Sequence, residues 1–128
     1  MRALLDTHVF LWWTTEDPKL SARASSFIRD PDNKPLLSLV SAWEIILKAR
    51  SGRLPIPGNA AEYVEVHSNI YGFEFLDLLL THLVHFYSLP AHHRDPFDLL
   101  LVAQAQVENL PIVTADAQFA KYDVEVIW

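Results

Sequence analysis

Apolar and polar residues follow two patterns that succeed each other along the chain. Short apolar runs bounded by proline, glycine or acidic residues predict buried strands, and longer stretches with helical spacing of apolar residues predict amphipathic helices. The strands are expected at residues 2–5, 35–39, 73–78, 111–114 and 124–127. The helices are expected at residues 8–13, 20–29, 41–50, 59–70, 81–88 and 95–107.

Because strands alternate with helices over the whole length, we expect an α/β fold in which helices cover both faces of a mostly parallel sheet. This is a three-layer sandwich with a central sheet of roughly five strands. A chain of 128 residues has the length of one domain, here residues 1–128. In open parallel sheets, ligands bind outside the carboxyl ends of the strands.

Four acidic residues stand where such a fold directs side chains to that edge of the sheet. Asp6 follows the first expected strand and Asp116 follows the fourth. Glu44 and Asp98 are expected in the first turns of two helices. Four carboxylates at one edge repel one another unless a divalent cation joins them, and oxygen ligands suit Mg²⁺ or Mn²⁺. The sequence therefore indicates a metal-dependent enzyme that acts on phosphate esters.

Helix capping is the alternative explanation for each acid taken singly. Glu44 fits an S-x-x-E capping box that begins at Ser41, and Asp95 fits an N-cap followed by proline. Asp6 and Asp116 could each cap the helix that follows. Serine, threonine or asparagine would cap equally well, however, and all four positions carry a carboxylate. As a set, the acids favour metal binding.

Polar neighbours of these acids are candidates for supporting roles. Thr7 and Thr114 could hold a carboxylate in place, or could reflect β propensity and local capping. Lys48 lies one turn after Glu44, where it could form a surface ion pair or contact a phosphate. Arg94 could contact a substrate phosphate or be a solvated loop charge.

Composition narrows the class of protein and of site. The net charge is −6, and leaving the four candidate ligands out of the count gives −2, which argues against tight, non-specific binding of nucleic acid but not against cleavage at a metal. Cysteine is absent, which excludes disulfides and thiolate metal sites and fits a cytoplasmic protein. The six histidines form no H-E-x-x-H motif, so we do not expect zinc. No apolar run is long enough to span a membrane.

One apolar cluster is too long to face a single core. Five large apolar residues in succession, Val9 to Trp13, cover more of a helix than one side. We therefore expect some of these five residues to contact another chain, either a second copy or a different partner.

The residues singled out above resemble those of PIN-domain proteins of the VapC toxin type, over nearly the whole length of the chain. The segments that carry the resemblance are Leu4-Leu5-Asp6-Thr7-His8, Ser41-Ala42-Trp43-Glu44-Ile45 with Lys48, His92-His93-Arg94-Asp95-Pro96-Phe97-Asp98 followed by Leu101-Val102-Ala103-Gln104-Ala105, and Val113-Thr114-Ala115-Asp116. The final Val126-Ile127-Trp128 is typical of one branch. In this order and spacing the segments are specific.

The resemblance implies a PIN-like fold and a Mg²⁺- or Mn²⁺-dependent endoribonuclease, the toxin of a toxin–antitoxin pair. It implies that Asp6, Glu44, Asp98 and Asp116 hold the metal, with Asp95 as a fifth acid beside them. It also implies a homodimer and a cognate antitoxin whose tail lies in a groove beside the site. Leu99 departs from the pattern, because related sequences commonly carry arginine there, and this puts a contact with RNA or a loop in question.

We hypothesise that one or two cations activate a water, which attacks the phosphorus in line and leaves a 5′-phosphate and a 3′-hydroxyl. Two other classes remain open. A metal-dependent hydrolase of small phosphate esters is one, although the D-x-D motif of haloacid-dehalogenase-like phosphatases is missing after Asp6. A catalytically silent PIN-like module that binds proteins is the other.

Overall fold

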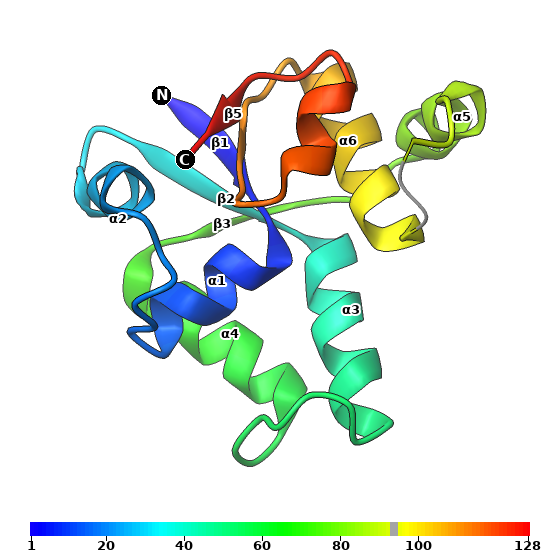
Figure 1. Cartoon of the computed structure of the whole chain (residues 1–128). Helices are drawn as coiled ribbons and strands as arrows, with labels where there is room; N and C mark the ends of the chain where they lie inside the picture. Colours follow the sequence, from blue (N-terminus) through cyan, green and yellow to red (C-terminus); the bar gives the residue numbers. More distant parts are fainter. Residues whose placement is uncertain (93–94) are drawn as a thin grey trace.

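The computed structural model describes residues 1–92 and 95–128 and has a five-stranded sheet in which every strand pair is parallel. The strands are β1 (Arg2–Leu5), β2 (Lys34–Ser38), β3 (Glu74–Leu76), β4 (Ile112–Val113) and β5 (Val126–Ile127). They lie in the order β3-β2-β1-β4-β5 (Figure 1). The chain runs outward from β1 to β3 and then returns past β1 to β4 and β5. The direction therefore reverses between β1 and β4, the kind of point at which open parallel sheets bind ligands.

Helices connect the strands, and local sequence signals mark several of their ends. Ser21 and Asn59 accept backbone hydrogen bonds as N-caps of α2 and α4, and Gly72 ends α4 in the left-handed conformation that glycine tolerates best. No helix in the described part of the chain is both long enough and apolar enough to cross a membrane. The helices are α1 (Thr7–Thr14), α2 (Ala22–Arg29), α3 (Leu39–Arg50), α4 (Ala60–Tyr71), α5 (Leu80–Ser88), α6 (Pro96–Glu108) and the short 3₁₀ helix η1 (Ala117–Lys121).

Two apolar cores, one on each face of the sheet, make the three layers. Alternate residues of β1 point to opposite faces: Ala3 and Leu5 join one core and Leu4 joins the other. The first core is formed with residues of α1 to α4, and the second with residues of α5, α6 and η1. Figure 1 shows these two groups of helices on either side of the sheet. The predicted three-layer α/β sandwich is therefore confirmed, with a sheet that is wholly parallel.

Helix α3 begins earlier than predicted, and this changes the position of one candidate ligand. The Ser38 hydroxyl accepts the Val40 amide at 3.0 Å, so Ser38 is the N-cap and the helix begins at Leu39 instead of Ser41. Glu44 consequently lies in the second turn, and its predicted place in the first turn was wrong. The capping-box explanation of Glu44 fails for the same reason. Asp98 does lie in the first turn of α6, as predicted.

Other boundaries moved because local caps decided them. Helix α2 begins at Ala22, since Ser21 caps it, and the strands β3 and β4 are shorter than their apolar runs. The 3₁₀ helix η1 was not among the predicted helices, although the capping alternative for Asp116 implied a helix after it. It follows Asp116, whose carboxylate accepts the Gln118 amide at 2.9 Å.

The apolar start of α1 is covered largely within the chain. Val9 and Phe10 are buried, and Trp12 and Trp13 are half-buried. The Trp12 ring lies 5.9 Å from the Trp128 ring, and the Trp13 ring lies 5.5 Å from the Tyr71 ring. Contact of some of the five residues with another chain stays a prediction.

Candidate functional site

The switch point of the sheet brings the ends of two strands together at Asp6. The Asp6 amide donates to the Val113 carbonyl at 3.0 Å, which places the residue after β1 beside the end of β4. Asp6 is 5% exposed, and Thr7 and Thr114 next to it are buried as well. Strand pairing alone therefore places one carboxylate and two hydroxyl groups at the edge where ligands are expected.

Asp6 uses only one of its two carboxylate oxygens. Its Oδ2 accepts the Thr114 hydroxyl at 2.8 Å, whereas the buried Oδ1 accepts no hydrogen bond within the described residues. Burial raises the pKa of Asp6 above its ordinary value, and the Glu44 charge adds to this effect. The Thr114 hydrogen bond, His8 and a hydrogen bond from the Thr7 backbone lower the pKa. An unpaired acceptor in a buried carboxylate is costly unless a cation or proton reaches it.

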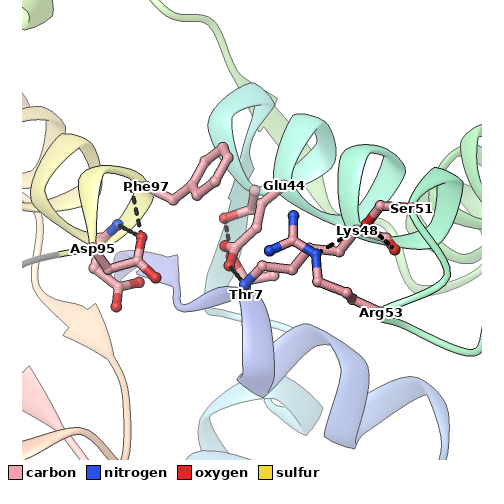
Figure 2. A network of polar contacts seen from close by, with 9 residues as sticks. Thr7, Glu44, Lys48, Ser51, Arg53, Asp95 and Phe97 are labelled. Atoms are coloured by element: carbon pink, nitrogen blue, oxygen red, sulfur yellow. Dashed lines mark hydrogen bonds and ion pairs between the residues drawn. The ribbon is translucent and has the colours of Figure 1, made fainter.

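Glu44 is the second buried acid, and polar partners surround it from two helices (Figure 2). Thr7 Oγ1 lies 2.7 Å from Glu44 Oε1 and 2.8 Å from Ser41 Oγ. Because a carboxylate only accepts, the single Thr7 proton goes to Glu44 and Ser41 donates to Thr7. Lys48 Nζ lies 2.5 Å from Glu44 Oε2. The predicted pair between Glu44 and Lys48 thus exists, but with a buried acid and not on an exposed helix face.

Asp95 and Asp98 open helix α6 on the other side of the site. The Asp95 carboxylate accepts the Phe97 amide at 2.8 Å and the Asp98 amide at 3.3 Å, so Asp95 is the N-cap that the sequence predicts. Burial raises the pKa of Asp98 to about 8, and the charges of four other acids add to the effect: Asp6, Asp95, Glu44 and Asp116. The carboxyl of Asp98 therefore lies within electrostatic reach of every other acid of the candidate set.

Asp116 and Thr114 complete this edge of the sheet. The Thr114 hydroxyl, which donates to Asp6, also accepts the Asp116 amide at 3.0 Å. Asp116 is half-buried and caps η1 through Gln118. Thr114 thus links the loop that carries Asp116 to the Asp6 carboxylate at the end of β1. β propensity alone does not explain these two hydrogen bonds.

The acids approach one another without forming a closed set of ligands. Within the described residues, no group of three or more histidine, aspartate or glutamate side chains is placed to hold a metal ion. Asp6 and Glu44 are turned to hydroxyl groups and a lysine, and Asp116 is turned to a backbone amide. Like charges without a cation between them favour this dispersal. Ligation of a metal by the four acids stays a prediction.

The donor set nevertheless suits one kind of cation. Every candidate ligand is a carboxylate, and Asp6 Oδ1 is a buried acceptor without a hydrogen bond in the described part of the chain. A divalent cation would satisfy that oxygen and offset the charges that raise the pKa of Asp98. Hard oxygen ligands fit Mg²⁺ or Mn²⁺.

Arg94 and Leu99 were also singled out in the sequence, and the structure describes only Leu99. Arg94 lies outside the described residues, so its predicted phosphate contact stays a prediction. Leu99, the departure from the family pattern, packs against the core beneath α5 and α6. Its side chain contributes to packing there.

Three residues near the site, Trp43, Phe97 and Arg53, were not among the predicted site residues. Trp43 is 53% exposed, its ring lies 4.9 Å from that of Phe97, and Phe97 also lies 5.9 Å from Lys48 Nζ. Arg53 is exposed, and its Nε donates to Ser51 at 3.0 Å. Trp43 directly precedes the buried Glu44 on α3, and this position could have indicated an exposed ring. The contacts of the Trp43 ring could not be predicted, because they depend on how α3 and α6 pack.

Comparisons with known proteins agree with this architecture. The sequence pattern of the family described as "PIN domain" matches residues 3–125. Ribonuclease VapC16 of Mycobacterium tuberculosis is 36% identical over 72 residues, which are 53% of this chain and 51% of that protein. The match thus spans about half the length of that curated relative.

Solved structures share the fold across nearly the whole chain. VapBC2 of Rickettsia felis, bound to a DNA fragment from its promoter, superposes with a TM-score of 0.70 at 15% identity and covers 98% of this chain and 97% of that chain. VapBC-5 of Mycobacterium tuberculosis superposes with a TM-score of 0.64 at 20% identity and covers 98% and 97%. The fold predicted from the resemblance to VapC-type proteins is therefore confirmed. Together with the sequence match over residues 3–125, it shows that the chain belongs to the PIN-domain family.

Proposed function

We propose that this chain is a single PIN domain that cleaves RNA as a VapC-type endoribonuclease dependent on Mg²⁺ or Mn²⁺. The observation that supports this most strongly is the pKa of Asp98, raised to about 8 by burial and by four neighbouring acids. A fold has little structural use for so much negative charge around one carboxyl. The curated relative Ribonuclease VapC16 supports RNA as the substrate.

Asp6, Glu44, Asp98 and Asp116 would hold the cation. When bound, the cation supplies an activated water and neutralises charge on the phosphate. The chain's own part is to orient the ligands. Thr114 holds Oδ2 of Asp6 so that Oδ1 is left for the cation, and Thr7 holds Oε1 of Glu44. In-line hydrolysis breaks the bond to the 3′ oxygen, which takes a proton and leaves a 3′-hydroxyl and a 5′-phosphate.

We also infer that the protein is the toxin of a toxin–antitoxin pair and acts in the cytoplasm, where its RNA substrates are. The solved structures with the same fold include VapBC proteins and a toxin–antitoxin complex from Klebsiella pneumoniae, which supports an antitoxin as partner.

A homodimer completes the proposal. Leu80, Val84 and Tyr87 on α5 are 75%, 64% and 92% exposed, and a second copy of the chain would cover such an apolar surface. Light scattering should give twice the chain mass of 14.6 kDa, and a monomer at every concentration would contradict the dimer.

The nuclease is tested by incubating purified protein with a pool of structured RNA in Mg²⁺, in Mn²⁺ and in chelator. We expect metal-dependent products with a 5′-phosphate, and a loss of at least about 100-fold in Asp6→Asn, because that variant removes a ligand. Asp123→Asn is the matched control, since it makes the same charge change at an exposed position. Equal cleavage by Asp6→Asn and wild type would refute the assignment of the site. Cleavage of a chromogenic phosphomonoester without cleavage of RNA would instead support the small-molecule hydrolase.

A further inference from the structure

Positive charge is concentrated at one end of α3, next to the acids. The chain has ten lysine and arginine residues against a net charge of −6, and three of the ten are Lys48, Arg50 and Arg53. They occupy the last turn of α3 and the loop after it. An acidic protein that acts on RNA needs a local source of attraction for phosphates, and Lys48 and Arg53 of this segment can provide one.

Lys48 is held at the site by its ion pair with Glu44, one of the four acids that would bind the metal. Its Nζ contacts Glu44 Oε2, and its side chain remains 29% exposed. The same ammonium lies 5.9 Å from the centre of the Phe97 ring. A cation that takes over Glu44 would release Lys48 one helical turn away from it, with its charge open to another anion.

Arg53 is oriented toward the same side of α3. Its Nε donates to Ser51 Oγ at 3.0 Å, and its amide donates to the Lys48 carbonyl at 2.9 Å. Figure 2 shows the guanidinium directed toward the part of α3 that carries Glu44 and Lys48. Arg53 forms no ion pair with any described residue, so its terminal nitrogens can serve a ligand.

Trp43 provides an aromatic surface beside these cations. Its ring meets Phe97 edge to face, which fixes it while leaving Trp43 53% exposed. Phe97 is the shared neighbour of Trp43 and Lys48. Exposed aromatic rings next to cations are the usual way in which proteins bind single-stranded nucleic acid, by stacking on bases and neutralising phosphates.

We propose that Lys48, Arg53 and Trp43 form the surface that binds single-stranded RNA on both sides of the bond to be cut. Lys48 and Arg53 take phosphates and Trp43 stacks on a base. In the absence of substrate, Lys48 stays paired with Glu44; when a metal binds Glu44, Lys48 moves to the RNA phosphate. This surface rests on the proposed nuclease function, because RNA is its ligand. It favours RNA over an acidic protein segment because the exposed Trp43 ring offers a surface on which a base can stack beside the cations.

The test is RNA binding without cleavage. Fluorescence anisotropy of a labelled single-stranded RNA of about ten nucleotides is measured in the Asp6→Asn background over a range of salt concentrations, with Mn²⁺ raised until it saturates the weakened metal site. Lys48→Gln and Arg53→Gln should each reduce the slope of log K against log salt by about 0.7, the value for one contact with a single-strand phosphate. Trp43→Ala should weaken binding by about tenfold at unchanged slope.

Arg50→Gln is the matched control. It makes the same charge change, but Arg50 lines a hollow with Ile46 and Leu54 that none of the candidate acids lines. The slope of log K against log salt for Arg50→Gln should equal that of the Asp6→Asn protein without a further change. Lys48→Arg should keep the slope, which separates loss of charge from any loss of folding caused by an unpaired Glu44.

The proposed surface would be overturned, even if the wild type cleaves RNA, by one result of the salt titrations. That result is an equal slope of log K against log salt for Lys48→Gln, Arg53→Gln and Arg50→Gln. Wild-type protein that neither binds nor cleaves RNA with metal present would refute the nuclease itself. Normal RNA binding by Trp43→Ala would also overturn the proposed surface, and loss of a partner protein in that variant would assign Trp43 to a protein interface.

Discussion

Asp6 and Glu44 are buried carboxylates that each depend on a threonine hydroxyl. Thr114 donates to Asp6 at 2.8 Å and Thr7 donates to Glu44 at 2.7 Å. A buried carboxylate needs such donors to remain charged, and a threonine hydroxyl satisfies only one of its oxygens. The unsatisfied Oδ1 of Asp6 is therefore the residue-scale feature that distinguishes this edge of the sheet from a set of helix caps.

Asp98 should make the metal-free protein less stable as pH rises. Its pKa is raised to about 8 in the folded protein, so the folded state binds the proton more tightly than the unfolded state does. Protonated Asp98 stabilises the folded state fully at pH values below the ordinary pKa of an aspartate. This stabilisation is lost as pH rises through about 8. In chelator, Asp98→Asn should therefore gain stability relative to wild type between about pH 5 and about pH 8.

Urea unfolding of both proteins across that pH range measures this difference, with Asp123→Asn as the control for the charge change. A difference between Asp98→Asn and wild type that stays constant with pH would contradict the crowding of acids around Asp98. Added Mn²⁺ should reduce the difference, because a bound cation stabilises the ionised carboxylates.

The positions of Asp6, Asp98 and Asp116 at element boundaries could be predicted from the sequence, whereas Glu44 lies in the second turn of α3. The hydrogen-bond partners of the four acids could not be predicted. The S-x-x-E pattern at Ser41 suggested a capping box for Glu44, but the Ser38 hydroxyl captures the Val40 amide and starts the helix earlier. The contact between Thr7 and Glu44 joins residues 37 positions apart, and no local pattern encodes it.

Helices α3 and α6 position the acids, and a buried polar network locks the two helices together. Gln104 of α6 is fully buried and lies 2.5 Å from the Ser38 hydroxyl, which caps α3. Its amide also donates to the Asp77 carbonyl at 3.2 Å. One side chain thus connects the start of α3, the segment after β3 and the middle of α6. This cross-link holds Glu44 and Asp98 in fixed relation.

Gln104→Leu should therefore destabilise the protein by about 1–3 kcal/mol, because it leaves the fully buried Ser38 hydroxyl without its acceptor. Gln118→Leu, at an exposed position, should change the stability little. Chemical denaturation measures both. A Gln104→Leu protein as stable as Gln118→Leu would show that the network contributes only packing.

At the scale of the whole molecule, the parallel three-layer architecture could be predicted because strands and helices alternate and the helices bury one side each. The order β3-β2-β1-β4-β5 could not, since it depends on pairing across long separations, and β4 and β5 have only two residues each. The exposed apolar surface of α5 also escaped prediction. Its residues fit a helical pattern, and only the packing against α6 reveals which of them remain uncovered.

We propose that the acids around the end of β1 form a divalent metal site. Calorimetric titration of Mn²⁺ into the metal-free protein tests it most directly, with Asp6→Asn and Asp123→Asn titrated alongside. We expect saturable binding by wild type and by Asp123→Asn, and binding weakened at least about tenfold in Asp6→Asn. Absence of binding by wild type, or equal binding by all three proteins, would contradict it.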